Sequence, residues 1–150
     1  LGRDISVIGN DVAELAGAIA YALPALEIVD SRIGDWDIKM VDTIADNASS
    51  GMFVLGTQPV SIHDIDLSGC SMVLEKNGAV ASEGSGAACL GNPLNALAWL
   101  ASMRIRRGEP LKAGDIILSG ALGPMVAATP GDSFRAHVEG VGGVGVRFAS

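Results

Sequence analysis

The 150-residue chain has little of several residue types on which particular functions depend. It has only two cysteines, Cys70 and Cys89, two histidines and 4% aromatic residues. A zinc site needs four ligands at short, regular spacings, and the sequence has no Cys-x-x-Cys pair, so zinc binding is not supported. We expect both cysteines to be buried free thiols of a protein in the reducing cytoplasm.

Basic residues are scarce as well. Ten lysines and arginines stand against 17 acidic residues, which gives a formal charge of −7. Binding to a phosphate backbone depends on cationic side chains that release counterions, so we expect no nucleic-acid partner. The longest stretch without charge, residues 84–103, contains glycines, a proline and asparagines and does not have the composition of a membrane span. We therefore expect no membrane partner either.

Apolar residues and turn formers are plentiful. Hydrophobic residues make up 49% of the chain, enough for one core, and 20 glycines with six prolines indicate many turns. Leu1 is not an initiator methionine, and no signal sequence follows it. We expect residues 1–150 to be a single domain whose upstream part is absent from this chain.

The hydrophobic pattern predicts two main helices. One is expected near residues 11–22, opened by a capping box of Asp11 and Glu14, and the other over residues 92–108. Asn77-Gly78 favours a type I′ hairpin. Short apolar runs predict strands at 25–30, 52–56, 72–76, 79–81, 116–119, 133–139 and 144–148. We expect an α+β fold with a mostly antiparallel, mixed sheet or barrel-like roll and two main flanking helices.

An acidic residue stands inside one predicted strand. Glu27 lies within Ala25-Leu26-Glu27-Ile28-Val29, and an ionised carboxylate is costly to bury without a cation or strong donors. A salt bridge to Arg32 or Lys39 explains it as well as ligation of a hard cation such as Mg²⁺ or Mn²⁺. A single acid does not make a metal site.

Small polar residues gather in two other segments. Residues 35–50 are predicted as a loop with short helical turns, where Asn47 and Ser49 would orient a water or a carboxylate-bearing substrate. Turn capping is the commoner role of such residues. Ser119 ends the predicted strand 116–119, and the glycines after it, beginning with Gly120, expose backbone N–H groups. That arrangement suits an anion, although a strand-to-loop exit explains the glycines equally well.

Two glycine-rich segments invite a cofactor interpretation. Residues 140–145 satisfy the letters of a dinucleotide motif, but only a strand follows where the motif needs a helix, so a glycine-bent strand is favoured. Residues 84–88 could cradle an anion, and a packing loop is the favoured interpretation there.

Four ordered segments together resemble the 2-keto-4-pentenoate (2-hydroxypenta-2,4-dienoate) hydratases of the fumarylacetoacetate hydrolase superfamily. These segments are residues 25–33, 45–50, 90–96 and 114–124. The resemblance runs from about Tyr21 to Phe148. Four blocks in order are more specific than any single motif above.

The resemblance implies a hydro-lyase of meta-cleavage aromatic catabolism that adds water to 2-hydroxypenta-2,4-dienoate, giving 4-hydroxy-2-oxopentanoate, with Mg²⁺ or Mn²⁺. It implies Glu27 as a metal ligand. It implies that Ser119 and Gly120 hold the substrate carboxylate. Ser49 or Asn47 would then orient water or relay a proton.

The family's Glu-x-Glu metal-binding pair, which comes before the position of Glu27, has no counterpart in this chain. We therefore expect the C-terminal portion of a hydratase catalytic domain. The resemblance also implies a homo-oligomer, with a downstream aldolase as a candidate partner. Two alternatives stay open: a 4-oxalocrotonate decarboxylase of the same superfamily, which loses CO₂ instead of gaining water, and a non-catalytic fragment or interaction module.

Overall fold

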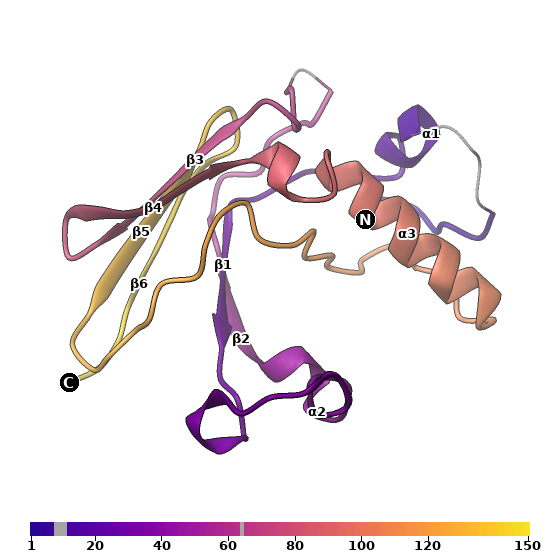
Figure 1. Cartoon of the computed structure of the whole chain (residues 1–150). Coiled ribbons are helices and arrows are strands. Elements are labelled where there is room, and N and C mark those ends of the chain that lie inside the picture. Colours follow the sequence, from indigo (N-terminus) through magenta and orange to yellow (C-terminus); the bar gives the residue numbers. More distant parts are fainter. Residues whose placement is uncertain (8–11, 64) are drawn as a thin grey trace.

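The strands of the chain form two separate antiparallel sheets. A computed structural model describes residues 1–7, 12–63 and 65–150. A two-stranded ribbon pairs β1 with β2, and a four-stranded sheet has the order β4-β3-β5-β6 (Figure 1). The elements in chain order are α1 (Val12–Ala16), β1 (Ala25–Val29), α2 (Met40–Ala45), β2 (Ser50–Leu55), β3 (Ser71–Lys76), β4 (Ala79–Ser85), α3 (Pro93–Arg106), β5 (Ser133–Val138) and β6 (Gly142–Arg147).

The four-stranded sheet is built from two hairpins. Asn77 and Gly78, at the β3–β4 turn, have φ angles of 52° and 83°, the positive values that a type I′ turn requires at both positions. Phe134 is buried on β5, and its ring meets that of Phe148 edge to face at 5.8 Å. Residues 140 and 141 belong to the β5–β6 turn and residues 142–145 to β6, so the predicted strand holds for the second part of the glycine-rich segment.

The β1–β2 ribbon projects from the rest of the chain and carries α2 at its far end (Figure 1). Short 3-10 helices at Gly34–Trp36 and Asn47–Ser49 complete that end, as the prediction of a loop with helical turns anticipated. At its base the ribbon contacts β6, where a Cβ on Gly56 would lie 3.0 Å from the carbonyl oxygen of Gly143. Glycine is needed at this close approach.

Helix α3 packs against α1 and supplies the centre of the core. Its start is fixed as predicted, with Pro93 in the first turn and the Asn92 side chain accepting a hydrogen bond from Leu94 N at 2.9 Å. No helix in the described parts of the chain is long and apolar enough to cross a membrane. The core cluster consists of Ile5, Leu15, Ala18, Leu97, Ala101 and Leu111.

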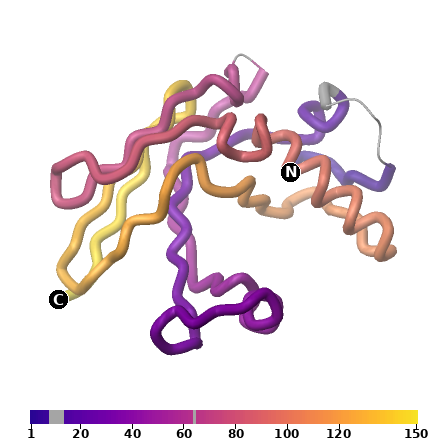
Figure 2. The backbone as a smooth tube through the Cα atoms, in the orientation of Figure 1, coloured from indigo at the N-terminus to yellow at the C-terminus, as the bar shows by residue number. Residues whose placement is uncertain are grey.

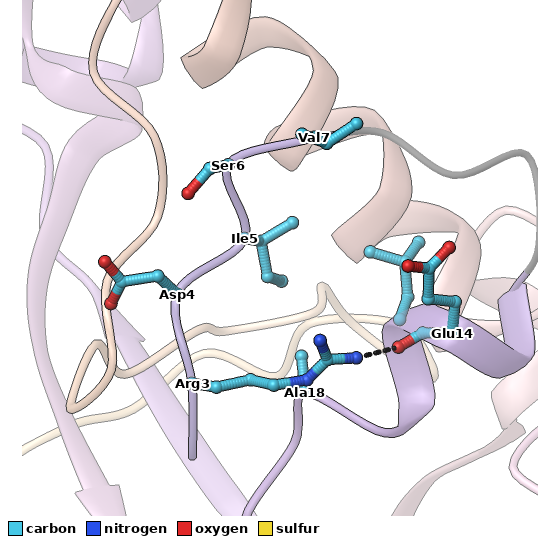
Figure 3. A pocket seen from close by; sticks show the side chains of 8 residues that line it. Arg3, Asp4, Ile5, Ser6, Val7, Glu14 and Ala18 are labelled. Carbon is cyan, nitrogen blue, oxygen red and sulfur yellow. Dashed lines mark hydrogen bonds between the residues drawn. The ribbon is translucent and has the colours of Figure 1, made fainter.

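The prediction of a first helix over residues 11–22 is wrong in extent, because α1 ends at Ala16. Gly17 weakens the helix, and Ala18 gives its carbonyl to Gly2 N at 2.8 Å instead of to a further turn. Arg3 caps the helix end by donating to the carbonyl of Glu14 at 2.9 Å, beside a pocket of about 260 Å³ (Figure 3). The expected cap at Asp11 lies outside the described residues. The described residues therefore contain one long helix, α3, and not two.

Residues 116–119 do not form the predicted strand. They belong to the connection from α3 to β5, which passes beside the four-stranded sheet (Figure 2). Further along it, Leu122 O accepts from Ser85 N at 3.0 Å and Pro124 O accepts from the Ser82 hydroxyl at 2.8 Å. Strand propensity becomes a strand only beside a pairing partner, and none flanks 116–119 in the described chain. The described strands accordingly do not close into a barrel.

The turn before β5 carries a heavily bonded carboxylate. Asp132 accepts from Thr129 N, Thr129 Oγ1 and Asn77 Nδ2, each at 2.8 Å, and pairs with Lys76 Nζ at 2.9 Å. These donors, Lys76 foremost, hold the pKa of Asp132 well below its usual range. The carboxylate therefore ties the end of the β3–β4 hairpin to the start of β5.

We expect Asp132→Asn to lower the free energy of unfolding, and to lower it more at neutral pH than at acidic pH. A carboxyl group whose pKa is lower in the folded than in the unfolded state stabilises the fold above the unfolded value of about 4, and this contribution disappears as pH falls. The difference in unfolding free energy between wild type and variant should therefore shrink below about pH 4. Urea unfolding at a series of pH values measures it, and a difference that is constant with pH would contradict the assignment.

Candidate active-site groove

A groove with a volume of about 1430 Å³ brings together segments that are far apart in the sequence. Its walls come from β1 and β2, from residues 114–128 and from the faces of β3, β5 and β6. Apolar side chains dominate the lining, and Glu27, Arg32, Ser119 and Gly120 are among its few polar groups. Large, mostly apolar hollows with a few convergent polar groups are the usual setting of small-molecule sites.

Glu27 is exposed, which corrects the expectation that the fold buries it. It lies on β1 opposite Phe53 of β2, whose side chain is itself 44% exposed. Residues alternate between the two faces of a strand, and the face of the ribbon that carries Glu27 is uncovered in the described chain. The premise of a buried carboxylate was therefore wrong.

The predicted salt bridge between Glu27 and Arg32 or Lys39 is also not found among the described residues. Arg32 instead directs its Nε toward Asp46 at 3.6 Å, and its Nη1 donates to the carbonyl of Asp30 at 3.1 Å. Glu27 lines the groove, and none of the salt bridges of the described chain includes it.

Ser119 and Gly120 line the same groove. Ser119 is half-buried, and its carbonyl accepts a hydrogen bond from the Cys89 thiol at 2.7 Å. Gly120 is exposed with a φ of 117°, a conformation that favours glycine. The structure thus brings Glu27, Ser119 and Gly120, which are far apart in sequence, to one groove.

Asn47 and Ser49 do not line the groove. They lie at the far end of the ribbon, on either side of Ala48. All three residues have left-handed backbone conformations, with φ angles of 51° for Asn47, 56° for Ala48 and 55° for Ser49. Ser49 is 4% exposed, and its hydroxyl donates to Asp46 Oδ2 at 2.8 Å, whereas Asn47 is exposed.

Asp46 organises this end of the ribbon. Besides the Ser49 hydroxyl it accepts from Arg32 N at 3.2 Å and from the Ser31 hydroxyl at 3.3 Å. The Ser49 hydroxyl, with further help from Arg32, lowers the pKa of Asp46. The carboxylate therefore stays ionised at neutral pH and joins the chain after β1 to the turn before β2.

The described residues do not form a complete metal site. Nowhere in residues 1–7, 12–63 and 65–150 do three histidine, cysteine or acidic side chains gather closely enough to hold an ion. Glu27 provides one hard oxygen ligand, whereas a divalent cation such as Mg²⁺ usually takes one or two carboxylates together with water and substrate oxygens. Any such ion beside Glu27 would need ligands from beyond these residues.

Sequence reasoning missed two contributors to this region. Arg32 had been considered only as a partner of Glu27, and the contact between Cys89 and Ser119 had no signal in the sequence, because it joins segments that only the fold brings together. Both cysteines are buried free thiols, as predicted.

Comparison with known proteins assigns the chain to a family. The family described as fumarylacetoacetate (FAA) hydrolase C-terminal matches residues 1–149, and the chain belongs to that family. The expected superfamily is thereby confirmed, together with an antiparallel fold that has few helices.

Among curated relatives, the chain is 57% identical to the 2-keto-4-pentenoate hydratase of Paraburkholderia phymatum, over 99% of its own length and 57% of that protein. It is 53% identical to the TodF product hydratase of Pseudomonas putida, over 99% of its length and 56% of that protein. The chain therefore spans a little over half the length of these relatives.

A solved structure shares the fold closely. The 4-oxalocrotonate decarboxylase from Pseudomonas putida G7, complexed with magnesium and adipate, superposes with a TM-score of 0.90 at 36% identity. The match covers 97% of this chain and 56% of the decarboxylase.

Proposed function

We propose that the intact protein containing this chain is a hydro-lyase that hydrates 2-hydroxypenta-2,4-dienoate to 4-hydroxy-2-oxopentanoate in meta-cleavage aromatic catabolism. The observation that carries the proposal is that Glu27, Ser119 and Gly120 line one groove. The resemblance assigns these residues to the metal and the substrate, and relatives named hydratases are 53% and 57% identical over nearly the whole chain.

We propose a divalent cation, Mg²⁺ or Mn²⁺, as cofactor, with Glu27 as one of its ligands. The hard carboxylate oxygens of Glu27 suit such an ion, and the decarboxylase of similar structure is complexed with magnesium. When bound, the cation would supply Lewis-acid polarisation of the 2-oxo acid. Residues 1–150 would then be the C-terminal portion of the catalytic domain, with the other ligands contributed from outside it.

The other proposed roles belong to hydrogen-bonding groups. The Ser119 hydroxyl and the Gly120 N–H bind the substrate carboxylate, which is stabilised by donors that are already in place. Asn47 or Ser49 orients water or relays a proton. Because the Ser49 hydroxyl already donates to Asp46, its oxygen would act as the acceptor of a water proton.

A turnover assay of the intact protein tests the function. We expect loss of the dienoate, formation of 4-hydroxy-2-oxopentanoate, abolition of turnover by a chelator and recovery on adding Mg²⁺ or Mn²⁺. The structural likeness to 4-oxalocrotonate decarboxylase makes decarboxylation the second candidate. Release of CO₂ from 4-oxalocrotonate without hydration of the dienoate would replace the first proposal with the second.

Ser119→Ala is expected to raise KM for the dienoate by about 10- to 100-fold, the value of a hydrogen bond to a charged group. The rate constant kcat should change less, because the carboxylate is not the reacting centre. Steady-state kinetics measures both, with Ser102→Ala on α3, outside the groove, as control. An unchanged kcat/KM for Ser119→Ala removes Ser119 from the site, and the same criterion applies to Ser49→Ala.

We also propose a cytoplasmic homo-oligomer that hands its product to a downstream aldolase. Self-association is supported by α2, which has no buried residue and exposes Met40, Val41 and Ile44. Exposed apolar clusters of this kind mark interaction surfaces.

A further inference from the structure

The Cys89 thiol bonds to the peptide that joins Ser119 to Gly120. Cys89 is 6% exposed, and its Sγ lies 2.7 Å from the carbonyl oxygen of Ser119. Its backbone is held by the 3-10 helix Gly86–Ala88, since Cys89 N donates to Gly86 O at 3.0 Å. Gly86 N in turn donates to Cys70 O at 3.0 Å. The thiol therefore approaches Ser119 from a fixed position.

This contact determines where the N–H of Gly120 points. All described peptide bonds are trans, and in a trans peptide the carbonyl oxygen and the amide hydrogen lie on opposite sides. Because the Ser119 carbonyl faces the thiol, the Gly120 N–H faces away from it. Both residues line the groove, and the Gly120 N–H has no acceptor within the described part of the chain. A donor is thus left available to an anion in the groove.

The conformation of Gly120 fits the same arrangement. A Cβ at this position would lie 3.2 Å from Cys89 Sγ, tighter than most such contacts, and the φ of 117° is one that side-chain-bearing residues rarely adopt. The thiol fills the space where a side chain would begin. Cys89 and Gly120 therefore form a matched pair.

We propose that Cys89 is a positioning residue, which fixes the Ser119–Gly120 peptide so that the Gly120 N–H and the Ser119 hydroxyl can bind the carboxylate of a 2-oxo acid. The inference rests on the proposed function, in which these two groups hold the substrate. Burial raises the pKa of the Cys89 thiol, so the group stays protonated and remains a donor at neutral pH.

The experiment compares variants of the intact protein by dienoate kinetics and by calorimetric binding of 2-oxopentanoate in the presence of Mg²⁺. We expect Cys89→Ala to raise KM and Kd about tenfold, with kcat within about threefold of wild type. Cys89→Ser keeps a donor and should restore both values. Ser102→Ala on α3 is the control, because Ser102 lies outside the groove.

Measuring KM and kcat separately distinguishes a positioning role from partial unfolding. Partial unfolding lowers the active fraction, and so the apparent kcat, without changing KM, whereas loss of positioning raises KM. If Cys89→Ala does not fold, Cys89→Val replaces it, since valine fills the space without a donor. The proposal is overturned if the donor-free variant keeps KM and Kd within about twofold of wild type, or if Ser102→Ala weakens binding equally. If wild type fails to hydrate the dienoate, the proposed function falls. Binding of 2-oxopentanoate then decides the role of Cys89 alone, and failure of wild type to bind it overturns that role too.

Discussion

Glu27→Gln in the intact protein is expected to lower kcat/KM for dienoate hydration by about a thousandfold or more. Glutamine keeps the shape of the side chain and removes its negative charge, which the proposed cation requires. Loss of a metal that stabilises developing charge removes several kcal/mol of transition-state stabilisation, and about 1.4 kcal/mol corresponds to a factor of ten in rate. No other substitution in the groove should cost as much activity.

The same substitution should leave the fold intact. Glu27 is exposed and has no salt bridge or side-chain hydrogen bond within the described residues, so its replacement breaks no such contact there. Surface changes of this kind usually alter stability by about 0.5 kcal/mol or less. Thermal unfolding should therefore coincide with wild type while calorimetry shows weakened Mn²⁺ binding.

Glu83→Gln provides the matched control for Glu27→Gln. Glu83 is an exposed glutamate on a strand, β4, and does not line the groove. It should keep wild-type turnover and metal affinity. Glu27→Gln with wild-type metal affinity and turnover would remove Glu27 from the metal site, and loss of activity in both variants would point to an unspecific effect of charge.

The sequence correctly predicted those parts of the fold that are determined by residues close together in the chain. The β3–β4 hairpin follows from the ability of Asn77 and Gly78 to take positive φ, and the start of α3 follows from Asn92 and Pro93. In both cases the turn or cap is made by residues adjacent in sequence, so the sequence pattern contains the interaction itself.

Predictions that depended on distant contacts were less accurate. Residues 116–119 have strand-forming side chains, but a strand also needs a partner, which no pattern within the segment specifies. Glu27 was expected to be buried because its neighbours are apolar, yet burial depends on what covers the ribbon. Helix α1 ends early because Gly2, near the N-terminus, takes the carbonyl of Ala18.

The candidate site, like the fold, was predicted only in part from the sequence. Resemblance singled out Glu27, Ser119 and Gly120, but only the fold shows that they share a groove and that Ser49 turns its hydroxyl to Asp46 instead. The support behind Ser119 comes from Cys89, which had been predicted only as a buried free thiol. Residues that touch a site can be recognised from motifs, whereas residues that orient them are found from contacts.

The packing of β4 against the connection to β5 leads to a large expected effect on stability, that of Gly84→Ala. A Cβ on Gly84 would lie only 1.9 Å from the carbonyl oxygen of Leu122 and 2.7 Å from its carbonyl carbon. Both are backbone atoms, so no side-chain rotation relieves the clash, and the segment that carries Ser119 and Gly120 must move away from β4. The hydrogen bond from Ser85 N to Leu122 O, 3.0 Å long, would be lost with it.

We expect Gly84→Ala to destabilise the fold by about 3 kcal/mol or more, the upper range for overpacking and a broken backbone hydrogen bond. A rise in KM for the dienoate should accompany the lower Tm, because the displaced segment contains the proposed carboxylate donors. Gly34→Ala is the control, since a Cβ there meets no heavy atom within 4 Å, and both values should stay at wild type. If Gly84→Ala lowers Tm but leaves KM unchanged, Ser119 and Gly120 do not bind the substrate. If neither changes, the close contact between β4 and Leu122 does not exist in solution.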